Sequence, residues 1–283
     1  MNDRYTIREM IKEEVARIAV KWAELEGWNP GLHDAGCFYA ADPHGFFVGE
    51  LDGRPVGCVS AVRYDDRFGF LGFYIVAPEY RGRGFGLRLF NEALRYMGAR
   101  NCGGDGVLAR IEDYRKLGFK PAYKNRRYQG RGAGGRKIDT ALEDIAAADF
   151  KRLAAYDGLI FPAKRHAFLK CWISQPDAKG YVMSSGRAVS GCGVVRRCCR
   201  GHKIGPLFAD GPAAAEKIFD ALVSSIPAGE ELFFDAPEAN PAAIALAERN
   251  GMRVVFETMR IYSSAAPAVP MEKVFGVTSF ELG

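Results

Sequence analysis

The sequence contains two copies of one pattern. Gly118 and Gly251 are 133 positions apart, and each stands between a short helical segment and a final strand pattern. The same separation relates two further pairs of residues, Gly53 with Gly186 and Arg63 with Arg196. A constant separation over most of the 283 residues indicates an internal repeat, in which one fold is built twice. The chain length also suits two domains.

A glycine-rich segment at residues 130–136 marks the boundary between the copies. We therefore expect a first domain over residues 1–132 and a second over 137–283. The first copy reads as helix, three strands, helix, strand, helix and strand, and the second repeats that order. This alternation predicts an α/β fold with a mixed sheet flanked by helices. Thr6 and Glu9 fit a capping box that would begin the first helix.

A glycine-rich turn at residues 81–86 follows an apolar strand pattern over 68–76 and precedes a helical pattern. This arrangement is typical of an anion site, because backbone N–H groups and the positive end of the helix dipole converge there. Glycine also lets the backbone approach a ligand closely. Leu87 stands where a dinucleotide fingerprint requires glycine, and no lysine follows as a nucleotide P-loop requires. The turn therefore predicts a different phosphorylated cofactor.

With Val76 and Pro78 just upstream, the R-x-x-G-x-G turn resembles the coenzyme A loop of the GNAT family of N-acetyltransferases. The resemblance implies two tandem GNAT-like domains, each with a mostly antiparallel sheet and a central, splayed pair of parallel strands. Three segments, 27–31, 205–210 and 273–283, are similar to bacterial two-domain acetyltransferases with a divergent C-terminal module. The implied cofactor is acetyl-CoA, and the implied cofactor-binding residues are Tyr74, Ile75, Val76, Arg81, Gly82, Arg83, Gly84, Phe85 and Gly86.

Only the first copy retains these features. Residues 81–86 correspond to 214–219, which contain neither glycine nor arginine, and Tyr114 corresponds to Ala247. We therefore expect one acetyl-CoA per chain, bound by the first domain. The second domain would then have a structural or acceptor-site role.

The resemblance implies direct transfer of an acetyl group to a primary amine, with Tyr114 as the proton donor to the leaving thiol. The family often has an asparagine and an alanine where this chain has Val107 and Arg110, whereas the second half has Asn240 and Ala243 at the equivalent positions. The candidate acceptor-site residues are Trp28, Asn29, Asp34 and Phe38, any of which could instead be a core or surface residue. For the general base, Glu26, His33, Asp34 and a water molecule all remain open.

Composition limits the partners. The net charge of +5 suits an anionic cofactor without requiring nucleic acid, and the basic segment 124–132 is explained more simply as a strand and linker. We expect no membrane segment and no metal, with Cys198, Cys199 and His202 as structural residues. Seven scattered cysteines indicate a reducing cytoplasm.

The alternative function is a non-catalytic acyl-CoA-binding sensor, and the oligomeric state is left open.

Overall fold

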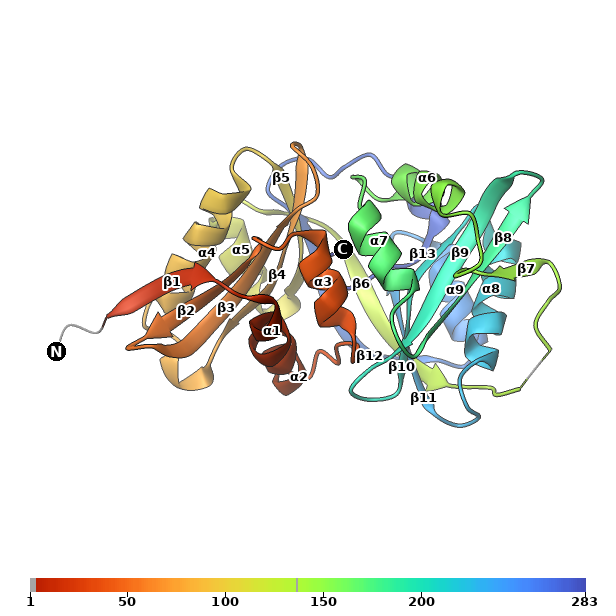
Figure 1. Cartoon of the computed structure of the whole chain (residues 1–283), viewed down its shortest axis with the longest axis horizontal. Helices are drawn as coiled ribbons and strands as arrows, with labels where there is room; N and C mark the ends of the chain where they lie inside the picture. The colour runs from red at the N-terminus through yellow and green to blue at the C-terminus, as the bar shows by residue number, and fades with distance from the viewer. Residues whose placement is uncertain (1–3, 136) are drawn as a thin grey trace.

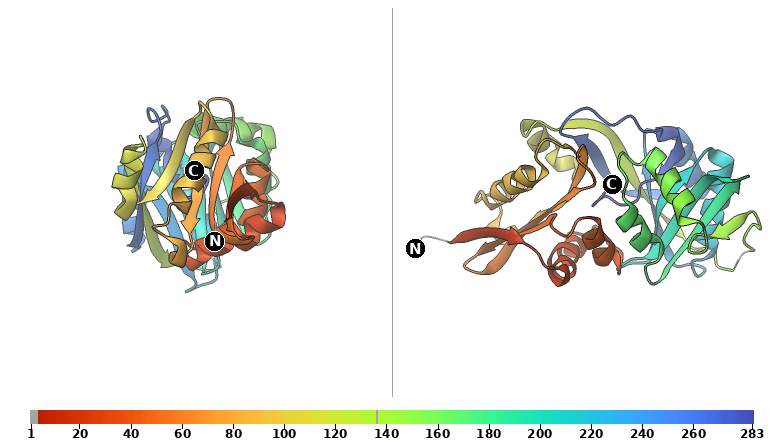
Figure 2. Two further views of the ribbon diagram at one scale, coloured as in Figure 1. Left: turned by 90° about the vertical axis from the view of Figure 1, so that its left-hand side faces the viewer. Right: turned by 45° about the horizontal axis from the view of Figure 1, so that its top comes forward.

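The computed structural model describes residues 4–135 and 137–283, and in these residues thirteen strands form one sheet. The two halves of the chain lie side by side along the long axis of the molecule (Figures 1 and 2). The predicted boundary segment includes residue 136, which lies outside the described residues, as do residues 1–3 of the predicted first domain. The division at 132 and 137 stays a prediction.

The elements of the first half are β1 (Tyr5–Glu9), α1 (Lys12–Glu14), η1 (Val15–Val20), α2 (Lys21–Leu25), α3 (Asp34–Ala41), β2 (Phe46–Leu51), β3 (Arg54–Arg63), β4 (Phe68–Val76), η2 (Pro78–Tyr80), α4 (Phe85–Met97), β5 (Asn101–Val107), η3 (Leu108–Arg110), α5 (Ile111–Lys116) and β6 (Lys120–Arg131). Those of the second half are β7 (Leu142–Asp144), α6 (Phe150–Ile160), α7 (His166–Ile173), β8 (Ala178–Ser185), β9 (Ala188–Arg197), β10 (His202–Ala209), α8 (Pro212–Ser224), β11 (Glu231–Pro237), α9 (Pro241–Arg249), β12 (Arg253–Tyr262), η4 (Met271–Lys273) and β13 (Val274–Gly276). The mixed α/β fold and the mostly antiparallel sheet predicted from the sequence are confirmed.

The two halves exchange one strand each, β6 and β12. The sheet order is β1-β2-β3-β4-β5-β12-β6-β11-β10-β9-β8-β7, and β13 pairs with β10. Strand β12, from the second half, therefore lies beside β5 of the first half, and β6 of the first half lies beside β11 of the second. The two exchanged strands also pair with each other. Each half thus completes the sheet of the other, which the sequence pattern did not indicate.

Alternation along the strands assigns the helices to opposite faces of the first half's sheet. Cys58 and Val62 of β3 belong to a core with η1, α3, α6 and α7, whereas Val59 and Ala61 belong to a core with α4. Successive strand residues point to opposite faces, so one strand contributes to both cores. The first core continues into the second half and places α3 beside α7 (Figure 1). An apolar core therefore extends across the two halves on this face of the sheet.

A disulfide joins these two helices. Cys37 on α3 and Cys171 on α7 are bonded, with their Cα atoms 5.1 Å apart. Neither the spacing of the cysteines nor the expectation of a reducing cytoplasm indicated this pairing. Cys198 and Cys199, proposed as structural residues, are free thiols, the first buried and the second exposed.

The start of the chain differs from the prediction. Thr6 and Glu9 lie in β1, which pairs with β2, so the predicted capping box is wrong. The helical region begins after Ile11 instead, where the Glu14 carboxylate accepts a hydrogen bond from the Ile11 N–H at 3.1 Å. Pairing with β2 prevailed because it places Tyr5 in a core, at 7% exposure.

Candidate active site

The glycine-rich turn forms the N-terminal end of α4. Gly84 is the residue before the helix and has φ +83°, and Gly82 has φ +76°, a region that favours glycine. A Cβ on Gly86 would lie 2.7 Å from the Tyr74 hydroxyl oxygen, so the glycine at this position leaves room for the Tyr74 side chain. The turn therefore presents backbone rather than side chain to the space before the helix, as an anion site requires.

The two arginines of the turn have partners within the chain. Arg81 donates from Nε to the Val76 carbonyl at 2.7 Å and forms an ion pair with Glu26 at 2.5 Å. The Arg83 guanidinium lies 5.0 Å from the centre of the Phe85 ring. Arg81 thus fixes the turn to both β4 and the end of α2.

Strands β4 and β5 separate beside this turn. They pair in parallel from Phe68 with Asn101 to Leu71 with Gly104, and no later pair joins them in the described residues. The pairing of β4 with β3 is irregular between Gly72 and Ile75, where Phe73 has φ +47°. The β5-facing edge of β4 beyond Leu71 is therefore open, and its backbone groups need partners from a ligand or water.

A cavity of about 570 Å³ extends from the turn along this open edge. Its lining includes Tyr74, Ile75, Val76, Arg81, Gly82, Gly84 and Gly86, seven of the predicted cofactor-binding residues; Arg83 and Phe85 do not line it. A groove with free strand edge and a glycine-rich anion site fits the pantetheine arm and the pyrophosphate of coenzyme A. Which residues contact a cofactor stays a prediction.

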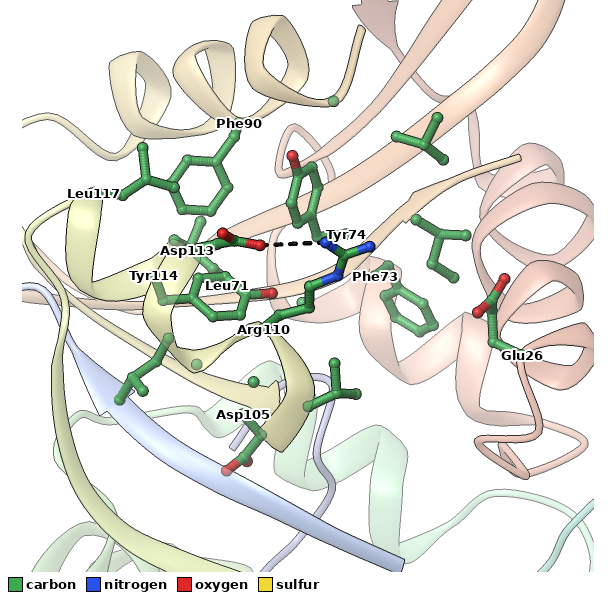
Figure 3. A pocket seen from close by; sticks show the side chains of 18 of the residues that line it. Glu26, Leu71, Phe73, Tyr74, Phe90, Asp105, Arg110, Asp113, Tyr114 and Leu117 are labelled. Atoms are coloured by element: carbon green, nitrogen blue, oxygen red, sulfur yellow. Dashed lines mark hydrogen bonds and ion pairs between the residues drawn. The ribbon is translucent and has the colours of Figure 1, made fainter. Parts of the chain in front are cut away.

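Tyr114, the predicted proton donor, also lines the cavity. It lies on α5 with its ring centre 6.3 Å from that of Phe90 and 6.4 Å from that of Phe119. Tyr114 and Tyr74 face the same space, with the Arg110–Asp113 ion pair drawn between them (Figure 3). Burial raises the pKa of Tyr114 to about 12, so the phenol holds its proton at neutral pH. A protonated phenol beside an open strand edge can act as a general acid.

Asp105 lies in the cavity wall on β5, although its carboxylate points away from Tyr114 (Figure 3). It accepts two hydrogen bonds from Arg260, at 3.0 and 2.8 Å, and one from Asn125 at 2.8 Å. Burial raises the pKa of this carboxyl group, and the Arg260 guanidinium opposes that shift. Because Arg260 is on β12 and Asn125 on β6, this cluster holds the exchanged strands to β5.

The second half contributes cavity residues that the sequence analysis missed. These are Phe256, Thr258 and Ile261 on β12, together with Phe280 and Glu281 near the end of the sequence. The sequence of segment 273–283 indicates a similarity to two-domain acetyltransferases, but it does not indicate a place in the cavity wall. A single acidic residue in an otherwise uncharged run, residues 274–283, was the available signal for Glu281.

Of the four candidate acceptor-site residues, only Trp28 is in the cavity lining. Asn29 instead exchanges hydrogen bonds with the backbone of Arg200. Asp34 is buried and accepts two hydrogen bonds from Arg196 at 2.7 and 3.0 Å, and Phe38 is buried beside Trp172. Their acceptor role stays a prediction.

Among the other candidates for the general base, Glu26 lines the cavity, and His33 Nε2 lies 3.4 Å from the Asp177 carboxylate.

In the second half, the equivalent groove is filled by the chain itself. Strand β13 pairs with β10 at Leu207 and Phe208, and it also packs against β11. Asn240 holds this segment, because its side-chain amide donates to the carbonyls of Glu272 and Val274 while its oxygen caps α9. The Asn240 side chain therefore has two roles, capping α9 and retaining β13.

Comparison with known proteins agrees with this architecture. Residues 9–119 match the model of the acetyltransferase (GNAT) family, and residues 153–276 match that of an acetyltransferase (GNAT) domain. The chain belongs to the GNAT family and is an N-acyltransferase with one GNAT module in each half. Among individual proteins, holothin acyltransferase of Pseudoalteromonas sp. (strain SANK 73390) is 34% identical over 269 residues, 94% of this chain and 91% of that protein.

Solved structures share the fold over nearly the whole chain. A putative acetyltransferase from Pyrococcus horikoshii superposes with a TM-score of 0.83 at 20% identity, covering 99% of this chain and 96% of that one. A tandem GNAT protein from the clavulanic acid biosynthesis pathway gives 0.64 at 12% identity, covering 93% and 100%. The predicted tandem arrangement is therefore confirmed.

Among the described residues, no helix is long and apolar enough to cross a membrane. None of their histidine, cysteine, aspartate and glutamate side chains gather in threes as a metal site would require.

Proposed function

We propose that the first half binds acetyl-CoA beside β4 and transfers the acetyl group directly to a primary amine. The observation that carries this proposal is that residues of the glycine-rich turn, the open edge of β4 and Tyr114 all line the same cavity. When bound, acetyl-CoA supplies the acyl group as a thioester that the amine attacks. The residues that surround it suit that reaction.

Three parts of the chain have separate tasks in this proposal. The turn and the N-terminal end of α4 hold the pyrophosphate. A backbone N–H at the irregular step of β4, around Phe73, stabilises the negative charge that develops on the carbonyl oxygen. Tyr114 donates its proton to the departing sulfur, since its raised pKa keeps the phenol protonated.

We further propose one acetyl-CoA per chain. The groove of the second half contains β13, and its residues 214–219 lack the glycines of the turn. Binding there would require displacement of β13 and of the two hydrogen bonds from Asn240.

The test is an assay of thiol release from acetyl-CoA with a panel of amines, combined with titration calorimetry of acetyl-CoA alone. The panel includes holothin, because the Pseudoalteromonas relative is named as its acyltransferase. We expect acceptor-dependent thiol release and one binding site per chain. Binding without release for any amine would favour the sensor function, and two sites per chain would contradict the assignment to the first half.

A further inference from the structure

The backbone on either side of Trp28, a residue of the cavity lining, has an unusual conformation. Gly27 and Asn29 have φ +78° and +54°. Glycine adopts this region freely, whereas a residue with a Cβ is strained there and keeps the conformation only where its surroundings fix it. In the described residues, the other non-glycine residues with positive φ are Asp52, Phe73 and Asp177. The strained residue Asn29 is thus the direct neighbour of a residue that lines the cavity.

The contacts that fix Asn29 come from the second half of the chain. Its side-chain amide donates to the Arg200 carbonyl at 2.9 Å, and its side-chain oxygen accepts from the Arg200 N–H at 2.8 Å. Arg200 lies in the turn that joins β9 to β10, and a backbone bridge between Gly31 and Cys198 of the same turn continues this pairing. The second half therefore holds the loop between α2 and α3 by side-chain and backbone contacts.

Two buried cations hold the backbone of Trp28 itself. Arg127 donates from Nη1 to the Trp28 carbonyl at 2.7 Å. Lys203 on β10 donates from Nζ to the Trp28 and Asn29 carbonyls at 3.4 and 2.7 Å. Lys203 is 1% exposed, and burial lowers the pKa of its ammonium group, whereas nearby buried carboxylates oppose that shift. Because a buried ammonium is costly, its bonds to two carbonyls of one loop indicate that this loop must keep one conformation.

Residues from both faces of the sheet line the cavity, which therefore passes through the sheet where β4 and β5 separate. Tyr74 and Tyr114 pack against the core on the α4 face, where the glycine-rich turn also begins its helix. The aromatic lining residues that belong to the core on the α3 face are Trp28, Phe73, Phe256 and Phe280. Since the proposed cofactor site takes up the α4 face, the aromatic wall on the α3 face is left for the acceptor.

We propose that Trp28 binds the apolar body of the acceptor amine, and that Asn29 and Lys203 are positioning residues that keep Trp28 in the cavity wall. This rests on the proposed function, and it narrows the acceptor to an amine on a flat, apolar body, because the wall is aromatic. It also gives the second half a task in the reaction. The β9–β10 turn and Lys203 of that half fix one wall of the site in the first half.

The test compares two amines that differ by one phenyl group, phenethylamine and ethylamine. Trp28→Ala removes the proposed contact. Asn29→Gly relieves the backbone strain but removes both side-chain bonds to Arg200, and Lys203→Met removes the ammonium at similar length. Asp52→Gly is the matched control, because it also replaces a positive-φ residue by glycine, in the turn between β2 and β3 and outside the cavity lining.

Three quantities are measured for each protein. They are the ratio of kcat/KM for phenethylamine to that for ethylamine, the shift in unfolding temperature caused by phenethylamine in the presence of coenzyme A, and the affinity for acetyl-CoA by titration calorimetry. The wild type should prefer phenethylamine roughly 10- to 100-fold, as burial of a phenyl group predicts. Phenethylamine should also raise the unfolding temperature of the wild type.

The variants should lose this preference. Trp28→Ala should lower the ratio about 10-fold, and Asn29→Gly and Lys203→Met about 5-fold, mainly through a higher KM for phenethylamine. Asp52→Gly should keep the wild-type ratio. Asn29→Asp, which retains the acceptor for the Arg200 N–H, should restore most of it. Affinity for acetyl-CoA should differ less than about 3-fold between Asn29→Gly and Asp52→Gly. If Lys203→Met does not fold, the two Asn29 variants decide the positioning role.

Four results would overturn the proposal. An unchanged ratio in Trp28→Ala would show that the indole does not bind the acceptor. An unchanged ratio in Asn29→Gly, an equal loss with both amines, or the same fall in Asp52→Gly would each refute the positioning role. A wild type that acetylates ethylamine but neither binds nor prefers phenethylamine would refute the apolar acceptor and leave the proposed function intact.

The converse result separates the two proposals. Stabilisation of the wild type but not of Trp28→Ala by phenethylamine, without acetylation of any amine, would support the binding wall and reject the proposed function.

Discussion

Phe73 and Pro206 occupy equivalent positions in the two halves, 133 residues apart, each at the irregular step of its strand. Phe73 has a backbone N–H at this step, whereas proline has none. Pro206 therefore cannot supply the N–H that the proposed mechanism assigns to the step in β4. Together with β13 beside it, Pro206 supports the proposal that the second half does not carry out acyl transfer.

Tyr114→Phe removes the proposed proton donor while retaining the ring that packs against Phe90 and Phe119. We expect kcat to fall about 100-fold or more, with the affinity for acetyl-CoA nearly unchanged, because general acids contribute on this scale. Steady-state kinetics and calorimetry measure the two effects. Tyr181→Phe in the second half is the matched control, and an unchanged kcat in Tyr114→Phe would show that the phenol is not the donor.

The pH dependence of the reaction tests the same residue. The pKa of Tyr114 is raised to about 12 by burial, with Tyr74, Arg110 and Asp113 also acting on it. The required form is the protonated phenol, so its contribution is lost only as the pH approaches about 12. The ratio of wild-type to Tyr114→Phe kcat/KM should therefore stay constant from about pH 7 to about pH 10. A ratio that declines within this range would mean that the phenol ionises there.

Gly84→Ala tests the turn, and Gly229→Ala is a close control. Both glycines have φ +83°, and a Cβ on either would meet no atom within 4 Å. Each substitution should cost about 1–2 kcal/mol of folding free energy, because alanine is strained in this region. Only Gly84→Ala should weaken acetyl-CoA binding, by roughly 10-fold or about 1.4 kcal/mol. Equal affinities in the two variants would argue against the turn as the pyrophosphate site.

The strand exchange predicts that the halves do not fold separately. A fragment of residues 1–132 lacks β12 beside β5, and a fragment of 137–283 lacks β6 between β11 and β12. Both fragments would expose unpaired strand edges. We expect poorly dispersed amide spectra from each alone and a native-like spectrum after the two are mixed during refolding. Cooperative thermal unfolding of either isolated fragment would contradict this expectation.

The Cys37–Cys171 disulfide should stabilise the contact between α3 and α7. Closing a loop of this length restricts the unfolded chain, so we expect Cys171→Ala to lower the free energy of unfolding by about 2–4 kcal/mol. Denaturant titration measures the loss, and mass spectrometry without reductant verifies the bond. Cys199→Ala, at an exposed free thiol, should change stability by less than about 0.5 kcal/mol. A protein equally stable with and without reductant would show that the bond does not contribute.

Local patterns in the sequence were sufficient for much of the fold. The apolar run at 68–76 forms β4, and the helical pattern that follows the glycine-rich turn forms α4. Such elements depend on residues close together in the chain, through burial, capping and turn conformation. The first strand was missed because its pairing with β2 depends on residues more than 35 positions away.

By itself, the sequence determined that one fold occurs twice and that the glycine-rich turn occurs once, because repeats and turn motifs are local patterns of residue type. Only the tertiary structure decided that β6 and β12 change places and that β13 fills the second groove. It also brought Glu281 beside Gly72, although more than 200 positions separate them in the sequence. Strand pairing and burial between such distant segments depend on how the whole sheet packs, which no local pattern specifies.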